Sequence, residues 1–267
     1  MAGDRITLQT LVLTSYRLVW RSLPHAILAL VPIVLFLLLS GAAGSVFEGG
    51  ALPLWAMLIS LFVFPPVFAL SISFLRAGQM RIARDEARGI GRAFSQSFDR
   101  LAHTTVLSIL VTLLPMALLI AILWLGAWMT SGRHILFLFL IAAVFWFTWT
   151  AAAGPFTLEN TRAIASIRKS AELIRPVFWK VMATIGLTVL PINVAMLLMS
   201  EWVQPLLYRS LEATAGLSNE TVIAFSITQI LLTWLYYAVF FSTLVAPGVA
   251  AWSTLTGKPD ELADVFS

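Results

Sequence analysis

Cations set at helical spacing just before apolar stretches are the side chains of this sequence best placed to do chemistry. Guanidinium and ammonium groups at such positions face the phosphates of an anionic leaflet, and each contributes on the order of 1 kcal/mol of attraction there. They would either anchor and orient the chain or recognise a particular anionic lipid, and both interpretations stay open. The candidates for contact with lipid headgroups are Arg17, Arg21, Arg168, Arg175 and Lys180.

Two amides are the strongest polar groups inside the apolar stretches, Asn193 and Gln229. Amides in a bilayer most often form hydrogen bonds between helices. The alternative is a polar spot for a ligand headgroup within the membrane. Asn193 follows Pro191 closely, so its amide could also satisfy a backbone carbonyl that the proline leaves without a donor.

Other kinds of chemistry lack the residues that they need. The chain has no cysteine, which excludes disulfides, thiolate nucleophiles and cysteine metal sites. It has no HExxH, GxSxG or Walker motif, and its three histidines are scattered. Ionisable residues are missing from the middle of the apolar stretches, which argues against a proton-driven pump. We therefore expect no enzymatic activity, no cofactor and no metal.

The elements that position these residues must be membrane helices. Hydrophobic residues make up 60% of the 267 residues and charged residues 11%, whereas a soluble domain has roughly 45–50% and about 25%. Crossing the bilayer takes about 20 apolar residues in a helix. Six stretches meet this requirement, and we predict spans at about 26–47, 52–75, 104–129, 135–156, 181–200 and 222–250. A signal peptide ending near residue 43 would leave only five spans.

The cations predict the orientation of these spans. If the chain has six spans, all but two of its 17 lysines and arginines lie on the side of the N-terminus, the exceptions being Arg133 and Arg209. Cytoplasmic loops carry such an excess. We expect a multi-pass protein with both termini in the cytoplasm. Because the cations gather at one membrane face, we do not interpret the net charge of +4 as nucleic-acid binding.

A basic amphipathic helix is predicted before the first, third and fifth spans. Thr10, Thr14, Arg17 and Arg21 form one polar stripe at helical spacing. The serines Ser15, Ser97 and Ser170 hold equivalent places in the three units. We predict one membrane domain, 1–257, with parallel repeats at about 5–75, 81–156 and 162–250, and a short cytoplasmic tail, 258–267.

Prolines occur in or near every predicted span. Proline removes a backbone donor and kinks a helix, so kinks at similar depth could open an interior cavity for a lipid or apolar small molecule. The other interpretation is that the kinks only shape packing, since proline is common in membrane helices. The residues concerned are Pro32, Pro65, Pro66, Pro115, Pro155, Pro191 and Pro247.

The segment AIASIRKSAELIRPVFWKVMATIGLTVLP, residues 163–191, resembles the YciC-like family of bacterial inner-membrane proteins and the membrane domain that precedes some glycerophosphodiester phosphodiesterases. Ser170 and the run Phe178, Trp179, Lys180 and Val181 carry the likeness. The resemblance implies six spans in a bacterial inner membrane. It implies no catalytic activity, because the phosphodiesterase reaction belongs to a soluble domain that would not fit in the short tail.

The sequence favours two functions. The first is a non-enzymatic membrane scaffold or envelope-maintenance component, with membrane lipids and a protein partner or a second copy of the chain as its contacts. The second is a carrier or binder of a lipid or apolar small molecule, which would use a cavity between the kinked helices. In both cases we expect anionic lipid at the cytoplasmic face.

Overall fold

The computed structural model of the chain is helical throughout its described residues, which are 7–46, 54–84, 89–115, 117–118, 132–198 and 219–256. No strand occurs in these ranges, and the prediction of an all-α protein is confirmed for them. The elements are α1 (Leu8–Arg21), α2 (Leu23–Val46), α3 (Leu54–Ala83), α4 (Ile90–Asp99), α5 (Leu101–Ser108), the π-helical turn η1 (Ile109–Leu113), α7 (Gly132–Thr150), α8 (Ala153–Leu158), α9 (Ala163–Ile174), the 3₁₀ turn η2 (Arg175–Val177), α10 (Phe178–Leu198) and α12 (Asn219–Thr256).

Four helical stretches within this part of the chain are long and apolar enough to cross a membrane. They are Phe62–Ala83, Ile141–Leu158, Ala163–Ala195 and Trp234–Thr256. A fifth is added if α1 and the first part of α2 count as one span, although they meet at a bend of 64°. These stretches overlap the second, fourth, fifth and sixth predicted spans. Much of the third predicted span lies outside the described residues, as do residues 199–218. The chain thus has the helices of a multi-pass membrane protein.

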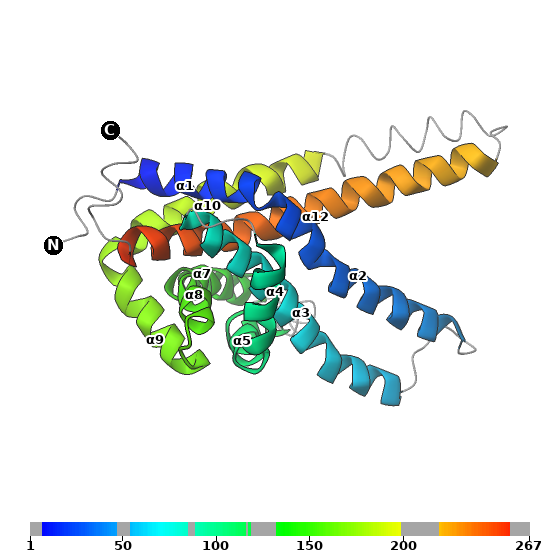
Figure 1. Ribbon diagram of the computed structural model, residues 1–267, viewed down its shortest axis with the longest axis horizontal. Coiled ribbons are helices and arrows are strands. Elements are labelled where there is room, and N and C mark those ends of the chain that lie inside the picture. The colour runs from blue at the N-terminus through cyan, green and yellow to red at the C-terminus, as the bar shows by residue number, and fades with distance from the viewer. Residues whose placement is uncertain are drawn as a thin grey trace.

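The helices gather in a packed centre, called the hub below, formed by α1, α8, the beginning of α10 and the C-terminal halves of α3 and α12. From it, α2 and α3 extend together in one direction, while the first half of α12 extends in another (Figure 1). α1 lies lengthwise against α10 and α12. Large side chains buried in the hub include Leu11, Leu75, Val181 and Val249.

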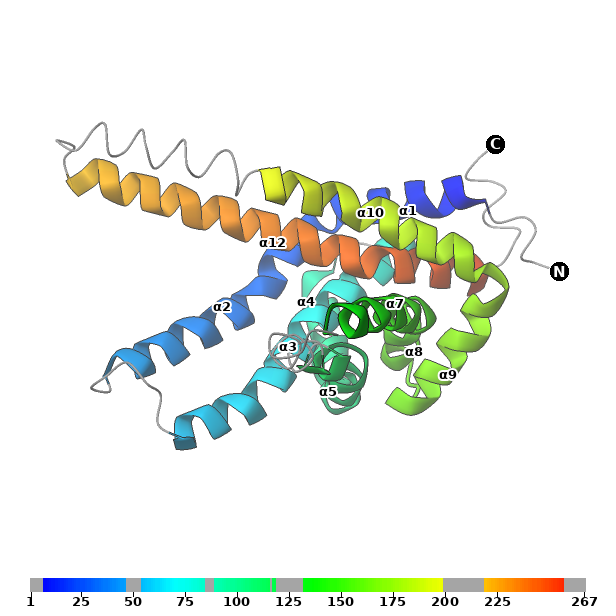
Figure 2. The ribbon, with the colours of Figure 1, turned by 180° about the vertical axis from the view of Figure 1, so that it is seen from behind.

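α1 begins, and α12 ends, at the same end of the molecule (Figure 2). At this end the N-terminus of α1 is capped by Thr7, whose side chain accepts a hydrogen bond from the backbone N–H of Thr10. Such a cap satisfies one of the donors that a helix start leaves free. A side-chain acceptor in the sequence thereby fixes where the first helix begins.

The prolines do not end the helices that contain them. α2 continues through Pro32, α3 through Pro65 and Pro66, α10 through Pro191 and α12 through Pro247. Each proline leaves the carbonyl four residues earlier without its usual donor. If these carbonyls contact a neighbouring helix, the kink is a packing contact, and if they face open space, it can form part of a cavity.

Candidate functional site

A buried amide on α3 joins three segments of the hub. Gln79 is fully buried, and its Nε2 donates to the hydroxyl of Ser22 (3.1 Å) and to the carbonyl of Ser242 (3.2 Å). Ser22 lies at the bend between α1 and α2, and Ser242 lies in α12. Since a carbonyl only accepts, the amide must point its nitrogen this way. Gln79 Oε1 and Ser242 Oγ are buried without hydrogen-bond partners among the described residues.

Two glycines leave space that is filled by the side chains of His25 and Arg76. The ring of His25 is buried against Gly78, where an added Cβ would lie 2.5 Å from Cδ2, and its centroid is 5.7 Å from that of Phe74. The guanidinium of Arg76 fills the space over Gly154, 2.0 Å from the place of an added Cβ. Arg76 Nε is buried without a hydrogen-bond partner in the described part of the chain. We expected His25 and Arg76 at the ends of spans, and the glycines that admit them to the hub were not identified.

Two prolines lie beside carbonyls that face other helices. Pro191 has no N–H for the carbonyl of Leu187, and the hydroxyl of Tyr16 on α1 donates to that oxygen at 2.8 Å. Pro155 is the third residue of α8, where a backbone N–H has no acceptor within the helix in any case, so it releases no carbonyl. The carbonyl oxygen of Ala151, in the break before α8, lies 2.0 Å from the place of an added Cβ at Gly248. At Pro191 the kink is filled by a neighbouring helix, so here proline shapes packing.

An open pocket of about 370 Å³ lies where α3 ends and α4 runs beside it. α3 contributes Met80, Arg81 and Arg84, and α4 contributes Arg92, Ser95, Gln96 and Asp99. The α4 residues recur at i, i+3, i+4 and i+7, which places them on one helix face. Two other faces of α4 differ from it, because Ala93 and Ser97 are buried while Ile90, Phe94 and Phe98 are exposed.

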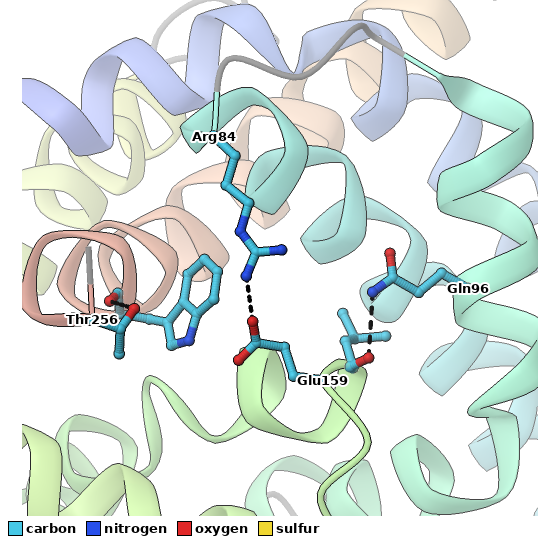
Figure 3. Close-up of polar contacts among 6 residues, drawn as sticks. Arg84, Gln96, Glu159 and Thr256 are labelled. Carbon is cyan, nitrogen blue, oxygen red and sulfur yellow. Dashed lines mark hydrogen bonds and ion pairs between the residues drawn. The ribbon is translucent and has the colours of Figure 1, made fainter. Parts of the chain in front are cut away.

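Arg84 connects the pocket with two further helices. Its guanidinium forms an ion pair with Glu159, just after α8, and lies 4.8 Å from the ring centroid of Trp252 on α12 (Figure 3). Gln96 reaches across in the same way, since its Nε2 donates to the carbonyl of Leu158 at 3.3 Å (Figure 3). The ends of α3, α8 and α12 are therefore clasped together beside the pocket.

The predicted headgroup contacts lie apart from this pocket. Arg17 and Arg21 are exposed on α1, and Arg175 is exposed at η2. Arg168 pairs with Glu172 of its own helix at 3.0 Å, and Lys180 is half-buried near the start of α10. None of the five is among the residues that line the pocket. They form a dispersed basic surface, and their contact with lipid stays a prediction.

Of the two predicted intramembrane amides, Asn193 has a described side chain. Asn193 donates from Nδ2 to the carbonyl of Val189, one turn earlier in its own helix, at 3.0 Å. The carbonyl released by Pro191 is instead satisfied by Tyr16. Gln229 belongs to α12, but its side chain lies outside the described residues.

The serines that hold equivalent places in the three predicted units are all fully buried. Ser15 and Ser97 donate to carbonyls one turn earlier in their own helices. Ser170 differs, because it joins α9 to the break between α7 and α8. Its hydroxyl donates to the carbonyl of Trp149 (2.7 Å) and accepts from the N–H of Ala152 (3.1 Å).

The chain matches no protein-family model, no curated protein and no solved structure. The resemblance over residues 163–191 therefore stays an interpretation of the sequence. What the chain does has to be inferred from its own geometry.

Proposed function

We propose that the chain is a non-enzymatic scaffold of the bacterial inner membrane, in which six spans hold three basic amphipathic helices at the cytoplasmic face. The closeness of the hub crossings is the observation that carries this proposal. At Gly248 an added methyl group would lie 2.0 Å from the backbone oxygen of Ala151, while at Gly78 and Gly154 it would meet the side chains of His25 and Arg76 at 2.5 and 2.0 Å. Carriers of the alternating-access type rock one bundle against another, which would repeatedly break contacts of this kind. A static hub suits a protein that organises others.

The proposed topology has support from the sequence and from the helix arrangement. The cation bias predicts cytoplasmic termini, and the start of α1 lies at the same end as the end of α12. Because the chain lacks cysteine, single cysteines can report the side of a loop. A cysteine at Ser95 should be labelled only from the cytoplasm, and cysteines at Ser131 and Ser218 only from the other side. Labelling of all three from one side would refute the topology.

The alternative function, a carrier of lipid through a kinked interior, makes a different demand on the prolines. It needs open space beside the kinks, whereas the carbonyl released by Pro191 accepts a hydrogen bond from Tyr16 of another helix, and α12 packs against the break that precedes Pro155. We therefore rank the scaffold first. The carrier becomes the alternative outcome of the same experiment.

Native mass spectrometry on protein extracted with its surrounding bilayer separates the two functions. A scaffold should emerge as a defined assembly larger than the 29.3 kDa chain. Gly248→Ala should push α12 away from Ala151 and lower the fraction of the chain found in that assembly. The control Gly186→Ala, with open space around the glycine, should leave this fraction unchanged. A bare monomer carrying a stoichiometric lipid in its interior would refute the scaffold and favour the carrier.

A further inference from the structure

We propose that the pocket between the end of α3 and α4 binds a phosphate group, held by Arg81, Arg84 and Arg92. This inference does not depend on the scaffold proposal. Arginine presents a planar fork of N–H donors that matches phosphate oxygens, often through two hydrogen bonds at once. Here three such side chains line one pocket from two helices.

The charge of the pocket lining favours an anion. Its seven residues include three arginines and one carboxylate, Asp99, so the lining carries a formal charge of +2. Ser95 donates to Asp99 Oδ2 at 3.5 Å, and Gln96 supplies a further polar group. Like charges that share a small concave site repel one another, and an anion placed between them relieves that repulsion.

Arg84 is held in place independently of its ion pair. The guanidinium carbon lies 4.8 Å from the centroid of the Trp252 ring, which is a cation–π distance, and this contact is separate from the ion pair. One edge pairs with Glu159, while the side chain also lines the pocket. Both side chains remain partly exposed, at 48% for Arg84 and 33% for Glu159. An incoming phosphate would therefore compete with the Glu159 carboxylate for the same guanidinium.

The dimensions of the pocket restrict the ligand to a small phosphate ester. A volume of about 370 Å³ lies at the lower end of the range of small-molecule sites, roughly 300–1,000 Å³. The phosphate can come from a lipid headgroup or from a soluble ester. The exposed Ile90, Phe94 and Phe98 give α4 an apolar face that suits the bilayer interface, while its opposite face lines the pocket. Both sources offer the same chemistry to the arginines.

Calorimetric titration of the full chain with glycerol 3-phosphate, in phosphatidylcholine nanodiscs, tests a soluble source. Native mass spectrometry of retained phosphatidylglycerol, from nanodiscs that contain both lipids, tests a lipid source. Arg92→Gln should weaken whichever binding is seen by about tenfold, as expected for the loss of a charge-assisted contact. Arg92→Lys should weaken it less, because the charge stays while the fork is lost. The control Arg162→Gln, on an exposed residue that neither lines the pocket nor belongs to the five predicted headgroup contacts, should leave it unchanged.

Glu159→Gln provides a test of opposite sign. It removes the competing carboxylate without changing the pocket lining, so affinity should rise about two- to fivefold, in keeping with the strength of a partly exposed ion pair. Binding of glycerol 3-phosphate would identify a soluble ester, and selective retention of phosphatidylglycerol would identify a lipid headgroup. If neither binds, or if Arg92→Gln and Arg162→Gln behave alike, the site is refuted. Weaker binding by Glu159→Gln would refute the competition.

Discussion

Gly248→Ala should destabilise the hub, because the backbone of another helix occupies the space that a methyl group would need. An ideal Cβ at this position would lie 2.0 Å from the carbonyl oxygen of Ala151 and 2.7 Å from its carbonyl carbon, whereas an ordinary contact begins near 3.4 Å. α12 would have to move by more than 1 Å. Ala246, Ala250 and Ala251 are fully buried on either side, so the shift would disturb a long contact.

The expected cost follows from the kind of neighbour. Overpacking a closely packed core costs roughly 1–3 kcal/mol and sometimes more, and here the obstacle is backbone, which cannot rotate away. Alanine regains about 0.5–1 kcal/mol of helix propensity over glycine. We therefore expect a net loss of about 2 kcal/mol in the free energy of unfolding, since the obstacle calls for the upper end of the overpacking range.

Gly186 on α10 is the matched control. It is exposed, and an added Cβ would meet nothing within 4 Å. Gly186→Ala should therefore stabilise the protein by about 0.5–1 kcal/mol through propensity and chain entropy. The two substitutions make the same chemical change in two apolar helices and should have opposite signs.

The free energy of unfolding in detergent micelles can be followed through tryptophan fluorescence, since the chain has ten tryptophans. Both variants should be compared with the parent chain at equal detergent and lipid content. Equal stability of Gly248→Ala and Gly186→Ala, or a more stable Gly248→Ala, would show that α12 does not approach Ala151 as closely as described. The argument for a static hub would then fail.

Three further substitutions test polar contacts of the helices. Ser170→Ala should lower the free energy of unfolding by about 2 kcal/mol, because it leaves a buried donor and a buried acceptor unpaired. Ser97→Ala should change it by no more than about 0.5 kcal/mol, since that hydroxyl bonds only a carbonyl of its own helix. Equal losses in equilibrium unfolding would contradict this. Tyr16→Phe should lower the free energy of unfolding by about 1 kcal/mol in the parent chain. In a chain that already carries Pro191→Ala, which restores the missing N–H, the same change should have almost no effect. Additive losses in the double-mutant cycle would show that the Tyr16 hydrogen bond does not compensate for the proline. Gln79→Met should cost about 1 kcal/mol and speed hydrogen exchange near the bend between α1 and α2, and unchanged exchange there would refute the bridging role.

The general architecture could be predicted because bilayer chemistry leaves few choices. A chain with so few charges cannot cover itself in water, and a backbone inside lipid must satisfy its own hydrogen bonds, so apolar stretches of sufficient length become helices. The described part bears this out, with four such stretches and a fifth in the bent pair of α1 and α2. Six spans stay a prediction, since parts of the first and third lie outside the described residues.

Partners distant in sequence were harder to predict. The burial of Arg76 depends on Gly154, and that of His25 depends on Gly78, yet a lone glycine in a helix has many explanations. Pattern reasoning places a cation near the end of an apolar run at the membrane surface, because its long side chain can reach water. Only the packing of α8 against α3 shows that the guanidinium of Arg76 lies over a glycine.

The arginine pocket was missed for a related reason. Arg81, Arg84 and Arg92 lie in the region where a basic amphipathic helix was predicted before the third span, and no feature of the sequence distinguishes them from the other cations. The packing of α4 beside the end of α3 brings them into one concave surface. Emphasis instead fell on the basic residues near the first and fifth spans, such as Arg17 and Arg168, which are exposed and dispersed. Spacing along one helix predicts a face, but a pocket needs two helices.

α3 links the two halves of the argument. One stretch of this helix places Gln79 between the bend of α1–α2 and α12, and two turns of helix or less separate Gln79 from Arg81 and Arg84 at the pocket. A binding group mounted on an immobilised helix has little conformational freedom left to lose when its ligand arrives. The contacts on which we base the scaffold proposal would therefore also give the proposed phosphate site a rigid support. A static core and a ligand-binding surface are for this reason compatible in one protein, and loosening the first should weaken the second.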